Sequence, residues 1–357
     1  MSADATSTEQ PGVPWRTAME TALYGPGGFY HRPEGGPGHH FRTASSASVD
    51  FARAVLRLLA EVDELLGRPS PLMFVEMAAA RGALLTAVHA LARDEAPGLA
   101  ARLQLVGVEL ADRPAIVPEE VGWVRDLADL PPVVGVLFAN EWLDNVPLDA
   151  VEQTAAGPRV VLVDRAGDES LGAVPDAASL GWLERWWPQC AEGDRAEIGL
   201  PRDEAWAAAV RRTRAGLAVA ADYGHDLAER TAGVHAGGTL TGYRDGRQVL
   251  PVPDGSCDIT AHVAIDSVAA AGAAALPATA STLLTDQRTV LRALGVVGDR
   301  PPRELASTDP RAYLQALSSA GQRAELTAHG GLGDFGWVLH AVGVPLPASL
   351  AAAAQAR

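Results

Sequence analysis

The sequence predicts an α/β fold in which a mostly parallel sheet is accompanied by an antiparallel hairpin and an inserted helical cap. Three observations support this prediction. Apolar runs of strand length alternate with helical patterns between residues 72 and 140, two β-rich runs flank the short link 155–157, and residues 179–214 are helical in pattern and rich in tryptophan. Strands that alternate with helices in this way are typical of a parallel, doubly wound sheet of the Rossmann-like type.

The elements of the sheet follow a long amphipathic helix. Residues 49–65 place apolar side chains close to the 3.6-residue period, and Gly67 ends that helix. After it the pattern predicts, in chain order, a strand at 72–77, a helix at 83–96, and strands at 103–110, 122–127 and 133–140. The later apolar run at 217–224 predicts a further strand.

The composition excludes several classes of function. A formal net charge of −15 argues against a nucleic-acid partner, because such binding relies on basic patches that neutralise phosphates. The chain holds no lysine, which rules out a Walker P-loop, a protein-kinase site and a pyridoxal-phosphate Schiff base. Cys190 and Cys257 are far apart, so neither a disulfide framework nor a metal site is expected.

The distribution of apolar residues bears on the location of the protein. No apolar run reaches the length that spans a bilayer, and the opening MSADATSTEQPG lacks the basic start and apolar core of a signal peptide. We therefore expect no membrane association and a cytoplasmic location.

The sharpest local feature is the stretch FVEMAAARGALL, in which a buried strand runs through a turn of small residues into a helix. Such a turn lets a ligand approach the backbone and the N–H groups at the start of the helix. The candidate binding residues in this turn are Ala78, Ala80 and Gly82. Only one glycine is present where dinucleotide-binding turns usually have three, so an ordinary strand-to-helix turn is the alternative interpretation.

Polar residues also end the next three strands. Glu109 could accept hydrogen bonds from both hydroxyls of a ribose, and Asp126 could accept one from an adenine amino group. Asn140, Glu141 and Asp144 crowd the tip of the fourth strand, where polar groups are costly unless they serve a purpose. Open α/β sheets bind ligands at this carboxyl edge, although Asn140 and Asp144 could instead cap the following turn.

With these residues in place, the chain resembles the MidA family of class I S-adenosylmethionine-dependent methyltransferases, which includes a mitochondrial complex I assembly factor that methylates protein arginine. The resemblance rests on segments found in the family's order: ALYGPGGFY, HFRTASSAS, VEMAAARGALL, ANEWLDNVP, DYGH, TLTGYRDGRQVLPVP, DITAHV and GLGDFGWVLHAVG. It implies a class I methyltransferase fold, S-adenosyl-L-methionine as cofactor and a protein substrate that carries arginine.

The resemblance implies cofactor contacts at the carboxyl edge of the sheet. Glu76 and Gly82 would lie at the methionine part of the cofactor, Glu109 at the ribose and Asp126 near the adenine. Ala78 and Ala80 stand where the family has glycines. Their two extra methyl groups predict cofactor binding that is weakened or lost.

Other residues would act at the methyl acceptor. Asn140 and Glu141 would face the methyl group, and Glu141 could hold an arginine guanidinium and concentrate electron density on the attacking nitrogen. The further acceptor-side candidates are His262, which could accept the released proton or be structural, and Asp144, Tyr223, Asp258 and Thr260. Ser45, Ser46 and Ala264 depart from the family pattern, so the substrate could differ from that of the relatives.

Aromatic residues and histidines outside these segments have simpler interpretations. Trp182, Trp186 and Trp187 follow near-helical spacing and are expected to anchor the cap rather than to form a cage for a methylated ligand. His39 and His40 have no acidic or cysteine cluster nearby, so they are expected to be loop residues.

The predicted division of the chain has five parts: a segment covering substrate and cofactor at 1–47, a SAM-binding core at 48–178, the helical cap at 179–214, further core strands and the substrate side at 215–350, and a tail at 351–357. Three other functions stay open. These are transfer to a small natural product, a non-catalytic protein that binds SAM or a partner, and a nicotinamide dehydrogenase. The sequence is compatible with a homodimer.

Overall fold

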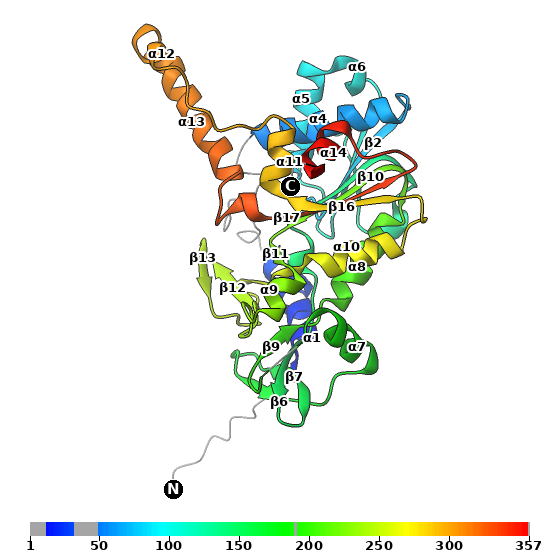
Figure 1. The fold of residues 1–357 in the computed structure, drawn as a ribbon, viewed down its shortest axis with the longest axis vertical. Coiled ribbons are helices and arrows are strands. Elements are labelled where there is room, and N and C mark those ends of the chain that lie inside the picture. The colour runs from blue at the N-terminus through cyan, green and yellow to red at the C-terminus, as the bar shows by residue number, and fades with distance from the viewer. Residues whose placement is uncertain (1–11, 32–48, 189–190, 356–357) are drawn as a thin grey trace. The chain divides into compact units, whose positions relative to one another are not determined.

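The computed structural model describes residues 12–31, 49–188 and 191–355 (Figure 1). Contacts divide the chain into two units, which we call the sheet unit and the small unit. The sheet unit comprises Phe41–Val146, Arg202–Asp226 and His262–Arg357, and the small unit comprises Met1–His40, Pro147–Pro201 and Leu227–Ala261. Of the segment expected at 1–47, only 12–31 is described, so His39, His40, Ser45 and Ser46 lie outside the described residues, as does Cys190.

The sheet unit is built on seven strands in the order β16-β17-β10-β5-β2-β3-β4 (Figure 1). The five strands from β10 to β4 run parallel, whereas β17 is antiparallel to both β10 and β16. The bounds are Leu72–Met77 (β2), Leu103–Val108 (β3), Gly122–Val124 (β4), Val133–Asn140 (β5), Thr213–Asp222 (β10), Ser281–Asp286 (β16) and Gly336–Val342 (β17). The mostly parallel, Rossmann-like sheet expected from the sequence is confirmed.

Helices bury both faces of this sheet. Successive strand residues point to opposite faces, so Phe138 of β5 packs into one hydrophobic core and its neighbour Leu137 into the other. The helices that contribute buried residues to the first core are α4 (Val49–Leu65), α5 (Ala83–Glu95), α6 (Pro97–Ala100), α11 (Gln287–Ala293), α13 (Pro310–Leu326) and α14 (Ala348–Gln355), and those of the second are α8 (Leu200–Val210) and α10 (Ile265–Ala274). The carboxyl ends of the parallel strands meet at one edge, where short turns follow them.

The sheet unit has further short elements. They are the 3-10 turns η3 (Leu127–Asp129), η4 (Leu143–Asn145) and η5 (Leu332–Asp334), the helix α12 (Arg303–Thr308), and the paired strands β11 (Gly224–His225) and β15 (Val263–Ala264). In Figure 1, α12 and α13 extend away from the sheet.

The small unit has its own sheets and its own hydrophobic core. A five-stranded sheet joins β1 (Val13–Pro14), β7 (Gly157–Val163), β6 (Ala150–Thr154), β9 (Arg195–Glu197) and β8 (Glu169–Leu171), and a three-stranded one joins β13 (Arg247–Val249), β12 (Thr241–Arg244) and β14 (Asp258–Thr260). The remaining elements are α1 (Trp15–Met19), the π-helical η1 (Glu20–Tyr24), η2 (Phe29–His31), α7 (Ala177–Trp186) and α9 (Leu227–Thr231).

The predicted hairpin is present as the antiparallel pair β6 and β7. It belongs to the small unit rather than to the parallel sheet, because β6 also pairs with β9 and β7 with β1 and β8. The mixed strand directions of the seven-stranded sheet come from β17 instead.

The stretch expected to form a helical cap is more divided than its tryptophan-rich pattern suggested. Residues 179–214 contain most of α7, then β9, then α8, and they end on the first residues of β10. Trp182 and Trp187 are buried in the small unit, whereas Trp206 of α8 is buried in a core of the seven-stranded sheet. Among the residues that the structure describes, no helix is long and apolar enough to cross a membrane.

Candidate active site

The turn between β2 and α5 has a glycine-like backbone although it is made largely of alanine. Ala78, Ala80 and Gly82 have φ angles of +49°, +47° and +68°. This left-handed region favours glycine, because a side chain there crowds the following carbonyl oxygen. Gly82 has a second reason to be glycine, since a Cβ on it would lie 2.6 Å from a methyl carbon of Val117. The turn therefore has a glycine-like backbone conformation at the positions where the resemblance predicts glycines.

Glu76, at the end of β2, is a buried carboxyl group whose hydrogen bonding is incomplete. Its side chain is 6% exposed, and its Oε2 has no hydrogen-bond partner within the described part of the chain. Burial, opposed by a hydrogen bond from the backbone of Leu85 and assisted by the charge of Glu109, raises the pKa of Glu76 to about 8. A bound cationic group would supply the compensation that the carboxylate lacks.

Glu109 follows β3 and links two backbone segments. Its Oε2 accepts a 2.8 Å hydrogen bond from the N–H of Ala80, and its Oε1 accepts a 3.0 Å one from the N–H of Ala111. Each carboxylate oxygen can accept a second hydrogen bond, so Glu109 retains capacity for ligand hydroxyls.

Asp126, after β4, is exposed and caps η3 by accepting a 2.8 Å hydrogen bond from the N–H of Ala128. Trp123 of β4, which we did not single out in the sequence, also lies at this edge. Its Nε1 donates to the carbonyl of Ala111 at 3.0 Å, and its ring fills the space beside Gly107, where a Cβ would come within 2.7 Å of it. Gly107 lies inside the otherwise apolar strand β3, and a glycine in such a position indicates that another group approaches the backbone closely.

Asn140 is the last residue of β5 and Glu141 follows it, as expected, and their side chains contact each other. The side-chain amide of Asn140 donates a 3.0 Å hydrogen bond to Oε1 of Glu141, which has a φ angle of +52°. On the adjacent strand β10, Asp222 is 1% exposed and its Oδ2 accepts hydrogen bonds from the N–H groups of Leu143 and Asp144, at 2.9 and 3.3 Å. Asp222 therefore satisfies two N–H groups at the start of the turn η4.

Asp222 sits among other carboxylates. Burial and the charges of Asp144 and Glu141 raise its pKa well above the ordinary value, and the nearby Arg202 guanidinium opposes this shift.

Tyr223 contacts two other predicted acceptor-side residues, Asp144 and His262. The hydroxyl of Tyr223 donates a 2.7 Å hydrogen bond to Oδ2 of Asp144, and the ring of His262 packs edge-on against that of Tyr223, with centroids 5.2 Å apart. Phe335 and His225 extend this ring cluster. We call Asn140, Glu141, Asp144, Asp222, Tyr223 and His262 the acceptor cluster.

Asp258 and Thr260, also expected on the substrate side, belong to β14 of the small unit, where both are buried. Oδ1 of Asp258 accepts a 3.1 Å hydrogen bond from the hydroxyl of Tyr30, in the same unit. Their partners in the β-ladder are Tyr243 and Thr241. The sequence analysis missed Asp222 of the acceptor cluster, although it ends an apolar strand as Asn140 does. It also missed the nearby Arg202, because no local pattern reveals the burial of that residue.

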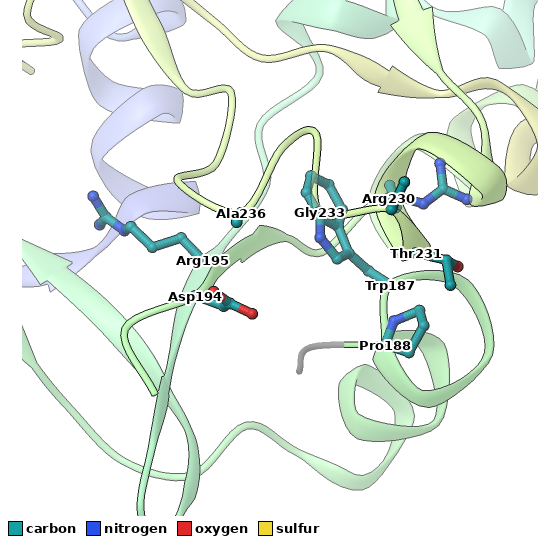
Figure 2. A pocket seen from close by; sticks show the side chains of 9 residues that line it. Trp187, Pro188, Asp194, Arg195, Arg230, Thr231, Gly233 and Ala236 are labelled. Atoms are coloured by element: carbon teal, nitrogen blue, oxygen red, sulfur yellow. The ribbon is translucent and has the colours of Figure 1, made fainter. Parts of the chain in front are cut away.

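A pocket of about 200 Å³ lies within the small unit (Figure 2). Figure 2 shows Asp194 and Arg195 on one side of it and Pro188 and Thr231 on the other. The Arg230 guanidinium lies 5.9 Å from the ring centre of Trp187, and its Nε donates to the carbonyl of Trp186 at 2.6 Å. None of the predicted site residues lines this pocket. The described residues hold no group of three or more His, Cys, Asp or Glu that could bind a metal ion.

The strand order, the β2–α5 turn and the polar carboxyl edge are those of a class I methyltransferase fold. The sequence pattern of the family described as "Putative S-adenosyl-L-methionine-dependent methyltransferase" matches residues 54–282. The chain belongs to this family, so it is an enzyme of the methyltransferase class and S-adenosyl-L-methionine (SAM) is its cofactor.

Two solved structures are similar over almost the whole chain. A COG1565 superfamily member from Burkholderia thailandensis, bound to S-adenosyl-homocysteine (SAH), has 25% sequence identity and a TM-score of 0.76, and the match covers 94% of this chain and 89% of that chain. A native structure of a COG1565 superfamily protein from the same organism has 25% identity and a TM-score of 0.75, with 95% and 90% covered. No curated protein matches the chain.

Proposed function

We propose that this methyltransferase is a divergent member of the MidA family and methylates the guanidinium group of protein arginine. The observation that carries the proposal is the gathering of Glu141, Asp144 and Asp222 at the carboxyl ends of the neighbouring strands β5 and β10. Carboxylates concentrated in this way suit a cationic acceptor, which they attract and orient.

The residues of the cofactor edge fit SAM. The buried Oε2 of Glu76, which has no partner among the described residues, suits the α-ammonium group of the methionine part. Glu109 would accept hydrogen bonds from the ribose hydroxyls, and Asp126 would accept one from the adenine amino group. The positive φ angles of Ala78, Ala80 and Gly82 keep the turn compact beside the ligand. When bound, SAM supplies a methyl group on a positively charged sulfur.

The acceptor cluster accounts for the handling of a guanidinium. An arginine side chain stays protonated at neutral pH, so its nitrogen must be oriented and must lose a proton as the new bond to carbon forms. Glu141 would accept hydrogen bonds from two N–H groups of the guanidinium, and Asn140 holds Oε1 of that carboxylate in place. His262 would accept the released proton, with its ring oriented by Tyr223.

The chemical form of the methylated product tests this proposal. Labelled SAM is added to an extract of cells that lack this protein, together with the purified enzyme. The protein fraction is then hydrolysed and analysed by mass spectrometry. We expect the label in methylarginine. Label in low-molecular-weight compounds would favour a natural-product acceptor, and label in another amino acid would overturn the arginine assignment.

The variant Glu141→Gln tests the role of the carboxylate. We expect its transfer rate to fall by about 100-fold or more, because a charge-assisted, two-pronged contact to the guanidinium is lost. Its affinity for SAH, measured by calorimetry, should stay within about threefold of the wild type, since a threefold change is under 1 kcal/mol. A wild-type transfer rate in this variant would remove the basis of the proposal.

A further inference from the structure

Arg202 is a buried cation beside the acceptor cluster. Its side chain belongs to α8 and the residue is only 1% exposed. The guanidinium donates hydrogen bonds to three backbone carbonyls: from Nε to Val146 at 3.2 Å, from Nη1 to His262 at 2.9 Å and from Nη2 to Asp144 at 2.5 Å. One side chain therefore ties the turn after β5 to the segment that precedes β15.

The two segments that Arg202 joins meet again through their side chains. Oδ2 of Asp144 accepts the hydrogen bond from Tyr223, and the ring of His262 packs against the same tyrosine. Arg202 thus holds the main chain of two residues whose side chains contact Tyr223. A shift of either backbone would change the direction of a carboxylate or an imidazole in the acceptor cluster.

Burying the charge of Arg202 at this position costs free energy. A buried guanidinium is stable only when its N–H groups are satisfied and its charge is compensated. The three carbonyls meet the first need, and the Arg202 charge acts on the buried carboxyl group of Asp222, which bears on the second. An apolar residue at this position would leave three backbone carbonyls without this donor, so Arg202 also has a structural role, which the test has to separate from a role in the reaction.

We propose that Arg202 is a positioning residue for methyl transfer: it fixes the backbone of Asp144 and His262 so that the acceptor cluster keeps its reactive geometry. Lysine cannot replace it, because a single ammonium group lacks the planar fork that reaches carbonyls in three directions. The charge alone is therefore insufficient, and the geometry of the hydrogen bonds is what the reaction needs.

The variant Arg202→Lys separates geometry from charge. Its total transfer of label from saturating SAM into an extract of cells that lack this protein is measured, without regard to which compound is methylated. SAH affinity is measured by calorimetry and the unfolding midpoint by thermal denaturation. We expect the transfer rate to fall about 10- to 100-fold, as displacements of about 1 Å produce, while SAH affinity stays within about threefold.

Arg288→Lys is the matched control. Arg288 is also buried, lies in the same unit, donates from Nε to the carbonyl of Thr327 at 2.9 Å and pairs with Asp334. A structural role alone predicts that both variants lose stability and that neither loses rate at saturating SAM. The proposal predicts a loss of rate for Arg202→Lys only. It is overturned if Arg202→Lys transfers at the wild-type rate, if Arg288→Lys loses as much, or if SAH binding falls in parallel.

Discussion

The backbone N–H of Ala80 donates a 2.8 Å hydrogen bond to Oε2 of Glu109, so the end of one strand holds the cofactor turn that follows another. The second oxygen of Glu109 accepts the N–H of Ala111. Hydrogen bonds to an ionised carboxylate are about twice as strong as neutral ones. Glu109 therefore supports the shape of the turn and, in our proposal, also contacts the ribose.

Replacing Glu109 by glutamine should weaken cofactor binding. The amide keeps one acceptor oxygen, so one of the two N–H groups loses its partner, at a cost of about 1–3 kcal/mol. We expect SAH affinity to fall by about 10-fold or more in calorimetric titrations. Glu120→Gln, at an exposed position, should bind SAH as the wild type does. Equal affinities in the two variants would contradict this role for Glu109.

Ala80→Gly should stabilise the protein. Ala80 has a φ angle of +47°, which costs alanine about 1–2 kcal/mol, whereas glycine adds about 0.4–1 kcal/mol of chain entropy to the unfolded state. The free energy of unfolding, measured by urea denaturation, should rise by roughly 0.5 to 1 kcal/mol. The neighbouring Ala79 is buried and has no positive φ angle, so Ala79→Gly should instead lower it. A loss of stability in both variants would show that the turn is unstrained.

Gly82→Ala should destabilise the protein and impair SAH binding. Its φ angle is +68°, and the added Cβ would lie 2.6 Å from Cγ2 of Val117. Combining it with Val117→Ala should restore part of the stability, because the second change removes the clash but not the backbone strain. Gly98→Ala, where a Cβ meets nothing within 4 Å, is the control. Unfolding midpoints of these three variants, of Val117→Ala alone and of the wild type settle the comparison, and an unchanged midpoint for Gly82→Ala would disprove it.

Glu76 should make the stability of the apo protein fall as the pH rises. Its pKa is about 8 in the folded state, against 4.5 for an ordinary glutamate. Below the ordinary value the carboxyl is protonated in both states. Between the two values only the unfolded chain releases the proton, so stability decreases with pH and levels off above about 8. The difference in unfolding free energy between Glu76→Gln and wild type should therefore grow in favour of the variant from pH 5 to pH 8. A constant difference would refute the shift.

Cofactor binding should release the same proton. At pH 7 the carboxyl of Glu76 is mostly protonated, and contact with the α-ammonium group of SAH favours its ionised form. Calorimetric titrations with SAH in buffers of different ionisation enthalpy should show the release of close to one proton at pH 7. Glu76→Gln should release fewer. Equal proton release in the variant and the wild type would place the α-ammonium group elsewhere.

The sequence predicted the five parallel strands of the sheet well because the evidence for them is local. The apolar runs that end at Met77 and Asn140 are long, buried on both faces and bounded by turns, so their type and order can be recognised without tertiary information. The clustering of Asn140, Glu141 and Asp144 at one edge follows from the same parallel order.

Long-range contacts could not be predicted in this way. The burial of Arg202 depends on carbonyls at Asp144, Val146 and His262, about 60 residues away in either direction along the chain. The hairpin was recognised, but its membership of a separate sheet depends on pairing with β9 and β1.

The left-handed conformation of Ala78 and Ala80 affects how such enzymes are recognised. These residues adopt the torsion angles that glycine would have, and the fixed points around them, Glu109 and the start of α5, impose that path. A search that counts glycines in this turn would classify the chain as a relative that has lost its cofactor site. The ends of the turn, rather than its composition, are the better criterion for deciding which distant homologues have kept a usable cofactor site.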